Sequence, residues 1–213
     1  MLVYVIMAII AYAIGSISFS VIISRKMAGF DVREKGSGNA GSTNMLRSVG
    51  KKAALLTLVC DILKGVVSVL LALVIGKINS NVDGAILVEL AAFFVVLGHT
   101  FPIFFEFRGG KGVATSLGVL LLINWKIGLI CLVFALILMA LTRMVSLGSI
   151  SAAILFPVLC IFITDCYLVP QNHLSYIIFA IIMAVFIAYN HRSNIKRLLN
   201  GTENKISFKK TEN

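Results

Sequence analysis

Two glycine-rich segments carry basic residues whose types and spacing suit the binding of phosphate. The first spans residues 36–47 and reads Gly-Ser-Gly-Asn-Ala-Gly-Ser-Thr-Asn-Met-Leu-Arg. Small residues let a backbone approach a ligand and expose its N–H groups, and the fork of Arg47 can hold two phosphate oxygens. A helix that begins near Thr43 would direct further N–H groups there. An ordinary glycine- and serine-rich turn is the alternative interpretation. The candidate ligand-binding residues here are Gly36, Ser37, Gly38, Asn39, Gly41, Thr43, Asn44 and Arg47.

The second segment spans residues 108–115 and reads Arg-Gly-Gly-Lys-Gly-Val-Ala-Thr. Three glycines can fold the loop around an oxyanion while Lys111 supplies a positive charge. The spacing differs from the GxxxxGK[ST] phosphate loop, so a nucleoside triphosphatase is not supported. A loop that only anchors the chain at the membrane face is the alternative. The candidates here are Gly109, Gly110, Lys111, Gly112 and Thr115.

A third polar segment follows the last apolar run, where His191 and Asn194 are spaced to share one face of a helix. Histidine can transfer a proton near neutral pH, whereas a basic helix gripping anionic lipid would explain the segment equally well. Ser146, shortly after Arg143, could reach the same pocket.

Asp61 and Lys64 lie three residues apart inside an apolar run, where lone charges are costly, so we expect a structural ion pair. No cluster of His, Cys and Asp has metal-ligand spacing, so we expect no metal and no cofactor. The four cysteines form no CxxC and are expected to pack as small apolar residues.

A membrane must position these segments. Apolar residues make up 59% of the 213-residue chain and charged residues 13%, against about 25% charged in soluble domains. Seven apolar runs are candidate membrane helices, and they predict an all-α, single-domain (1–213) protein with about seven spans and a loose polar tail. The fourth and fifth runs are short, so they could be tilted, thinned at one end or partly re-entrant. The expected spans are residues 2–23, 53–76, 84–105, 113–124, 127–142, 145–164 and 174–190.

Charge sets the expected orientation. Of the 19 lysines and arginines, all except Lys64, Lys77 and Lys126 follow the first, third, fifth or seventh span. Positive residues favour the cytoplasmic side, so the N-terminus should lie outside and the C-terminus inside. The net charge of +10 is therefore interpreted as membrane orientation and an anionic substrate, and nucleic acid is not expected as a partner.

Together these residues resemble the bacterial acyl-phosphate:glycerol-3-phosphate acyltransferases of the PlsY type. The match begins at Gly15-Ser16 and includes residues 36–64, 98–102, 109–115, 143–146 and 191–203 in one order. The chain departs from the family pattern at Ser42, where alanine is usual, and at Ser18 and Ser20, which replace a proline and a glycine.

The resemblance implies transfer of a fatty acyl group from acyl phosphate to glycerol 3-phosphate, giving 1-acylglycerol 3-phosphate (lysophosphatidic acid) and phosphate in phospholipid biosynthesis. It implies a multi-pass protein of the bacterial plasma membrane, surrounded by lipid, with its site facing the cytoplasm. Either His191 or a substrate phosphate could accept the hydroxyl proton, and no protein partner is indicated. The implied active-site residues are Ser37, Arg47, Lys111, Ser146, His191 and Asn194, with Glu203 holding the C-terminal segment.

Two alternative functions can be compared with these residues. Acyltransferases with a His-x-x-x-x-Asp motif are excluded, because Phe104, Ile178 and Lys196 stand where the aspartate would be. A transporter of an anionic or lysolipid substrate would also suit seven spans with basic loops. Transporters usually bind near the membrane midplane and often contain repeats, whereas the polar residues here gather at one face.

The predicted orientation can be tested with single cysteines in a cysteine-free background. Replacing Ser37 or Asn204 should give a thiol that an impermeant reagent does not label in intact cells, whereas a cysteine at Asn81 should be labelled. Labelling of either of the first two positions from outside would contradict the predicted topology.

Overall fold

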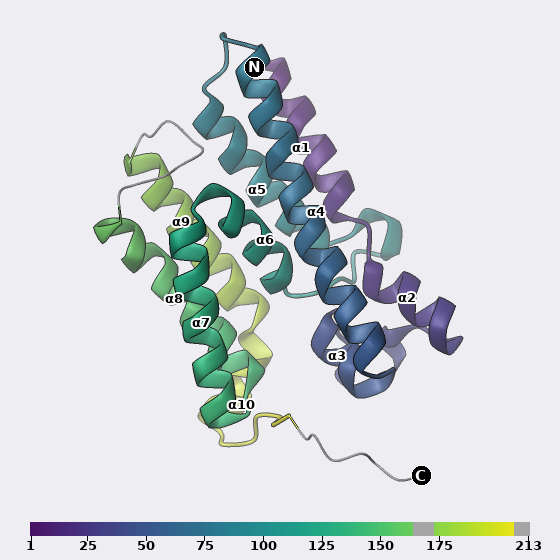
Figure 1. Cartoon of the computed structure of the whole chain (residues 1–213). Coiled ribbons are helices and arrows are strands. Elements are labelled where there is room, and N and C mark those ends of the chain that lie inside the picture. The colour runs from purple at the N-terminus through teal and green to yellow at the C-terminus, as the bar shows by residue number, and fades with distance from the viewer. Residues whose placement is uncertain (164–172, 207–213) are drawn as a thin grey trace.

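The computed structural model describes residues 1–163 and 173–206, and over these ranges every regular element is a helix (Figure 1). Long apolar runs favour helices in lipid, where each backbone polar group must be satisfied within its own segment. The helices are α1 (Leu2–Gly15), α2 (Phe19–Ala28), η1 (Val32–Glu34), α3 (Ser42–Ser48), α4 (Lys51–Ile78), α5 (Gly84–Thr100), η2 (Ile103–Phe105), α6 (Val113–Ile123), α7 (Trp125–Thr142), α8 (Val145–Phe162), α9 (His173–Asn190) and α10 (Arg192–Leu199).

Five helical segments of the described chain are long and apolar enough to cross a membrane, and a sixth is possible if α9 and α10, which meet at 67°, form one span. The all-α, multi-span class predicted from the sequence is therefore confirmed, but seven full spans are not. Residues 113–124 form only α6, whose eleven residues rise about 17 Å, little more than half of a hydrocarbon core of about 30 Å. The five segments are Leu2–Ala28, Lys51–Ile78, Gly84–Phe105, Trp125–Thr142 and Val145–Phe162.

The first apolar run is broken between α1 and α2, around residues 16–18. The Lys64 ammonium, on α4, donates hydrogen bonds of 2.8 Å to the carbonyl oxygens of Gly15 and Ile17. The carbonyls at a helix end lack partners within the helix, so Lys64 supplies donors where the break leaves acceptors. Asp61 lies 3.2 Å from the same ammonium, and this pair takes the structural position expected for it.

Glycines bring α4 and α6 into backbone contact, a common device where helices pack in membranes. A Cβ atom at Gly65 of α4 would lie 2.4 Å from the Thr115 carbonyl oxygen, and one at Gly118 of α6 would lie 2.1 Å from that of Ile62. Each helix therefore presents a glycine to the other's backbone. This contact holds α6, and the glycine-rich loop before it, against α4.

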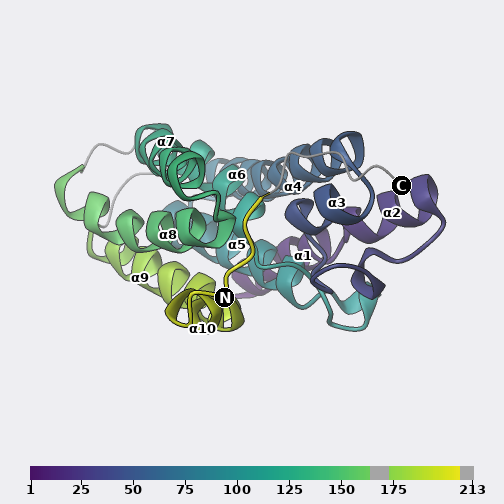
Figure 2. The ribbon, with the colours of Figure 1, turned by 90° about the horizontal axis from the view of Figure 1, so that it is seen from below.

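The polar segments gather at one end of the bundle. In Figure 1 the N-terminus lies at the top, whereas α3 and α10 lie towards the bottom and α6 starts at its lower end. Viewed from that end in Figure 2, α6 lies between α4 and α7. Helices α8 and α9 lie below α7 in this view, and α10 lies next to α9. The fold thus collects three segments that are distant in sequence around one end of α6.

The α4–α6 contact gives a stability prediction. Gly65→Ala and Gly118→Ala should each lower the free energy of unfolding by about 1–3 kcal/mol, because the added methyl must push two helices apart. The measurement is thermal unfolding in one detergent. Gly84→Ala is the matched control, because a Cβ there meets nothing within 4 Å. Equal melting temperatures for all three variants would contradict the close contact.

Candidate active site

Asn44 organises the first glycine-rich loop. Its side-chain oxygen accepts a 2.9 Å hydrogen bond from the Ser37 backbone N–H, and its amide nitrogen donates to the carbonyl oxygens of Val32 at 2.9 Å and Lys35 at 3.0 Å. Asn44 is 2% exposed, and α3 begins at Ser42, one residue before the expected start. The loop is therefore built around the buried side-chain amide of Asn44, whose oxygen and nitrogen both form hydrogen bonds with backbone groups.

The second loop is packed against the end of α5. The backbone N–H groups of Gly109 and Gly110 donate 3.1 Å hydrogen bonds to the carbonyl oxygens of Thr100 and His99. A Cβ at Gly110 would lie 2.1 Å from Nε2 of His99, so only glycine fits there. The Gly109 carbonyl also accepts from the Ala40 N–H at 3.4 Å. The two glycine-rich loops are thus joined directly, and Lys111 follows at a fixed place.

The C-terminal segment completes the polar cluster. The Lys111 ammonium donates to the side-chain oxygen of Asn194. Asn194 in turn donates to Glu203 Oε1 at 2.9 Å, and Arg197 Nε lies 3.0 Å from Glu203 Oε2. Beyond these, the Ile206 N–H donates to the Arg143 carbonyl oxygen at 2.8 Å. Residues 202–206 therefore fold back over the site; the end of the tail, predicted to be loose, lies outside the described residues.

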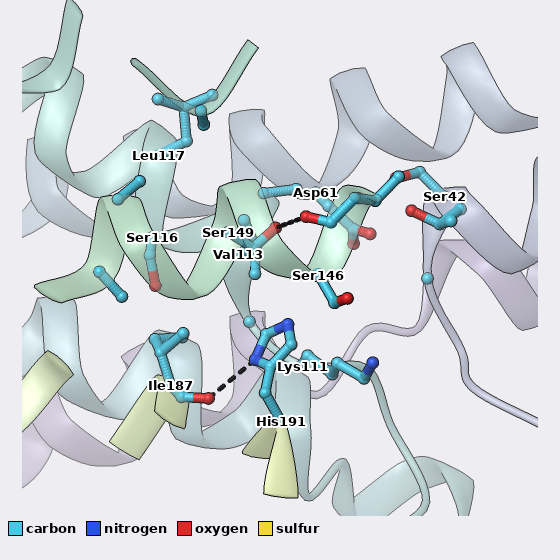
Figure 3. A pocket seen from close by; sticks show the side chains of 18 of the residues that line it. Ser42, Asp61, Lys111, Val113, Ser116, Leu117, Ser146, Ser149, Ile187 and His191 are labelled. Atoms are coloured by element: carbon cyan, nitrogen blue, oxygen red, sulfur yellow. Dashed lines mark hydrogen bonds between the residues drawn. The ribbon is translucent and has the colours of Figure 1, made fainter. Parts of the chain in front are cut away.

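One cavity of about 760 Å³ joins this polar cluster to an apolar arm. The three polar segments line one end, where Figure 3 shows Lys111, Ser146 and His191 next to one another. The arm runs between α4, α6, α7, α8 and α9 and is lined by aliphatic and aromatic side chains. Its lining includes Leu58, Ile62, Leu117, Leu120, Leu132, Ala135, Met139, Ala153, Phe156, Phe179, Met183 and Ile187.

Positive charges converge at the polar end. Burial lowers the pKa of Lys111 to about 8; the Glu203 carboxylate opposes this, and the cations of Arg197 and Arg47 add to it. Burial would raise the pKa of Glu203, but hydrogen bonding by Asn194 and the charge of Arg197 hold it below its usual value. Arg47 has no hydrogen bond or ion pair with another described residue and also lines the cavity. The polar end is thus suited to an anion.

His191 is held in one tautomer. Its Nδ1 lies 2.8 Å from the Ile187 carbonyl oxygen, and because that oxygen can only accept, Nδ1 must carry the hydrogen. Nε2 is then the ring's acceptor. The side chain is 2% exposed, and burial, together with the charge of Lys111, lowers the pKa of His191 to about 4. The ring is therefore neutral near pH 7 and able to accept a proton.

Most of the predicted site residues line this one cavity, although they come from segments far apart in the chain. Gly109 and Gly110 pack the second loop, while Thr115 is fully buried beside Gly65. Gly36 and Gly38 have φ angles of 58° and 70°, a backbone conformation that glycine adopts readily. Those lining the cavity are Ser37, Asn39, Gly41, Thr43, Asn44, Arg47, Asp61, Lys111, Gly112, Ser146, His191, Asn194 and Glu203; those outside it are Gly36, Gly38, Lys64, Gly109, Gly110 and Thr115.

Several polar residues that line the cavity were not predicted as site residues, among them Arg197, Ser149 and His99. Arg197 lies one turn after Asn194, and Ser149 one turn after Ser146, so helical spacing from a predicted residue is the signal for both. His99 lines the cavity with its Nδ1 3.5 Å from Asp61 Oδ1. The sequence alone does not pair His99 with Asp61, because the pairing depends on how α4 packs against α5.

Fold and site together define a membrane-embedded helical protein in which one cavity joins a cationic, polar end to an apolar arm. Its sequence matches the family model described as glycerol-3-phosphate acyltransferase over residues 5–201. Relatives of that name from Clostridioides difficile and Shouchella clausii are 44% and 41% identical, over 97% and 93% of both chains.

Solved structures agree. The crystal structure of PlsY (YgiH), an integral membrane glycerol 3-phosphate acyltransferase, in its glycerol 3-phosphate form has a TM-score of 0.81 and 37% identity over 96% of both chains. Its lysophosphatidic acid form has a TM-score of 0.80 and 35% identity over 96% of this chain and 95% of that one. This chain therefore belongs to the glycerol-3-phosphate acyltransferase family, as its motifs predicted.

Proposed function

We propose that this protein transfers a fatty acyl group from acyl phosphate to glycerol 3-phosphate, giving 1-acylglycerol 3-phosphate and inorganic phosphate. The observation that carries the proposal is the single cavity in which Arg47, Lys111 and Arg197 meet at one end and apolar side chains continue from it. Both substrates bear phosphate, and the donor also bears an acyl chain. The family's crystal structures with glycerol 3-phosphate and lysophosphatidic acid support the same acceptor and product.

The reaction needs no covalent enzyme intermediate. A hydroxyl oxygen of glycerol 3-phosphate attacks the carbonyl carbon of acyl phosphate, a new ester bond forms, and the bond between that carbon and the phosphate oxygen breaks. Phosphate leaves with the bonding electrons, and the hydroxyl proton passes to a base. Because acyl phosphate is already activated, the protein's task is to position the two substrates and stabilise the developing negative charge.

The positions of the polar residues suggest how that task is divided. Arg47 offers a planar fork that can bind two phosphate oxygens at once. The ammonium of Lys111 lies among the other cations and can stabilise the charge that develops on the leaving phosphate. Asn194 and Glu203 orient Lys111, and Asn44 shapes the loop that presents Ser37.

Nε2 of His191 is our choice for the proton acceptor, and an oxygen of the substrate phosphate is the alternative. If His191 moves the proton, His191→Ala should lower kcat more than it raises KM. If His191 only positions substrate, KM for glycerol 3-phosphate should rise while kcat holds.

We also propose that the site faces the cytoplasm of a bacterial cell. Nearly all lysines and arginines lie beside the end of the bundle that carries the cavity's polar cluster, and positive residues favour the cytoplasmic side. Counting the short helix α6 as a seventh, partial crossing gives an odd number of crossings, which agrees with the N-terminus and α10 lying at opposite ends of the bundle in Figure 1. The N-terminus would then lie outside.

The test of the proposed function is turnover by the detergent-purified protein with defined donors. Palmitoyl phosphate and glycerol 3-phosphate should give 1-palmitoylglycerol 3-phosphate, whereas palmitoyl-coenzyme A should give little. Arg47→Lys and Lys111→Ala should each lose tenfold activity or more, because a charged hydrogen bond contributes roughly 1.5–3 kcal/mol.

Lys52→Ala is the control for the loss of a basic side chain, since Lys52 is exposed and does not line the cavity. Equal rates with palmitoyl-coenzyme A would contradict the donor assignment. Near-wild-type rates in Arg47→Lys and Lys111→Ala together would contradict the shared phosphate site.

A further inference from the structure

We propose that Phe156 and Phe179 close the apolar arm and so set the longest acyl chain that the enzyme accepts. This inference rests on the proposed function, because it takes the arm as the place of the donor's acyl chain. It concerns the end of the cavity farthest from Lys111, where none of the residues of the phosphate site lies.

The cavity lining stops partway along four of the helices that form the arm. On α8 the last lining residue is Phe156 and on α9 the uppermost is Phe179; neither Cys160 nor Tyr176, one turn farther on, lines the cavity. On α6 the lining stops at Leu120, and on α7 at Cys131. On each of these helices the lining ends before the helix does, which indicates a closed end.

Aromatic rings seal that end. The Phe156 ring lies edge-on to Phe179 at 6.3 Å and to Tyr176 at 6.0 Å between centroids, and Tyr176 stacks on Phe179 at 6.3 Å. All three side chains are 6–7% exposed. Rings packed in this way are large and have few rotamers, so a chain end that meets them cannot advance without displacing the cluster.

The depth of the arm matches one membrane leaflet. Phe156 follows Ser146, at the polar end, by ten residues on α8, which is about 15 Å along a helix axis. Half of a hydrocarbon core of about 30 Å is also about 15 Å. The arm can therefore hold a chain as long as those of the surrounding lipid, and the aromatic cluster stands where a longer chain would continue.

Ala153 offers a way to shorten the same arm. It lines the cavity one turn before Phe156 on α8, between the aromatic cluster and Ser149, which Figure 3 shows at the polar side. A larger side chain at this position would obstruct the arm below its present end. Removing a ring at the closed end should therefore let the enzyme accept longer acyl chains, whereas a larger side chain at Ala153 should restrict it to shorter ones.

The experiment is an internal competition. Purified enzyme receives glycerol 3-phosphate and an equimolar mixture of myristoyl, palmitoyl, stearoyl and eicosanoyl phosphates, and mass spectrometry measures the products. Phe156→Ala and Phe179→Ala should raise the ratio of eicosanoyl to palmitoyl product about tenfold over wild type, since one methylene in an apolar pocket already changes selectivity by about tenfold or more. Ala153→Leu should instead favour myristoyl product.

The controls are Phe162→Ala, whose side chain is 77% exposed on the same helix, and Ala140→Leu, an exposed alanine of α7; both should give the wild-type profile. The inference is overturned if the phenylalanine variants are active and give the wild-type distribution of acyl products. If those variants do not fold, the same result in Ala153→Leu overturns it. Such a result would mean that the chain leaves sideways between the exposed Leu55 and Leu136, which also line the cavity. Wild-type enzyme that forms no product from any donor overturns the proposed function itself.

Discussion

Lys111 must carry a positive charge in a partly buried place, and the arrangement of the site depends on meeting that constraint. Moving an ammonium out of water is costly unless other groups take over its solvation. Asn194 accepts a hydrogen bond from Lys111, and Glu203 accepts one from Asn194 while it pairs with Arg197. The lysine is therefore stabilised directly by the side-chain amide of Asn194 and, through that amide, by the carboxylate of Glu203. The ammonium keeps hydrogen-bonding capacity for a phosphate.

The fold places that lysine through backbone contacts. The close packing of α6 on α4 at Gly65 and Gly118 holds the start of α6, and Gly110 fits against His99 just before Lys111. On the other side of the cavity, the buried amide of Asn44 ties the first loop together. Backbone and amide contacts are well suited to this work, because they fix a charged side chain without adding charges that compete for the substrate.

Much of the site could be predicted from the sequence, because phosphate binding needs glycines, small polar residues and cations in short segments. The sequence could not show that Thr115 faces α4 or that Gly109 and Gly110 support the loop, since those roles depend on how α4, α5 and α6 pack. Helical class followed from the apolar runs. The short helix α6 and the break after Gly15 did not, because hydropathy measures how apolar a run is and not where a helix ends. The apolar arm is formed by five helices, and no single run of residues encodes it.

The central claim is that Lys111 acts as a buried cation, and the pH dependence of kcat/KM for glycerol 3-phosphate tests it most directly. Burial among cations lowers the pKa of Lys111 to about 8, so its charge is present below that pH and is lost as the pH rises through it. Because kcat/KM reports the free enzyme, its value should fall above about pH 8. Bound phosphate favours the charged lysine, so the fall in kcat should lie at higher pH. In Lys111→Arg the fall in kcat/KM should move beyond pH 10, because arginine stays protonated. A wild-type kcat/KM that holds its value to pH 10, or an alkaline fall that is unchanged in Lys111→Arg, would contradict the account.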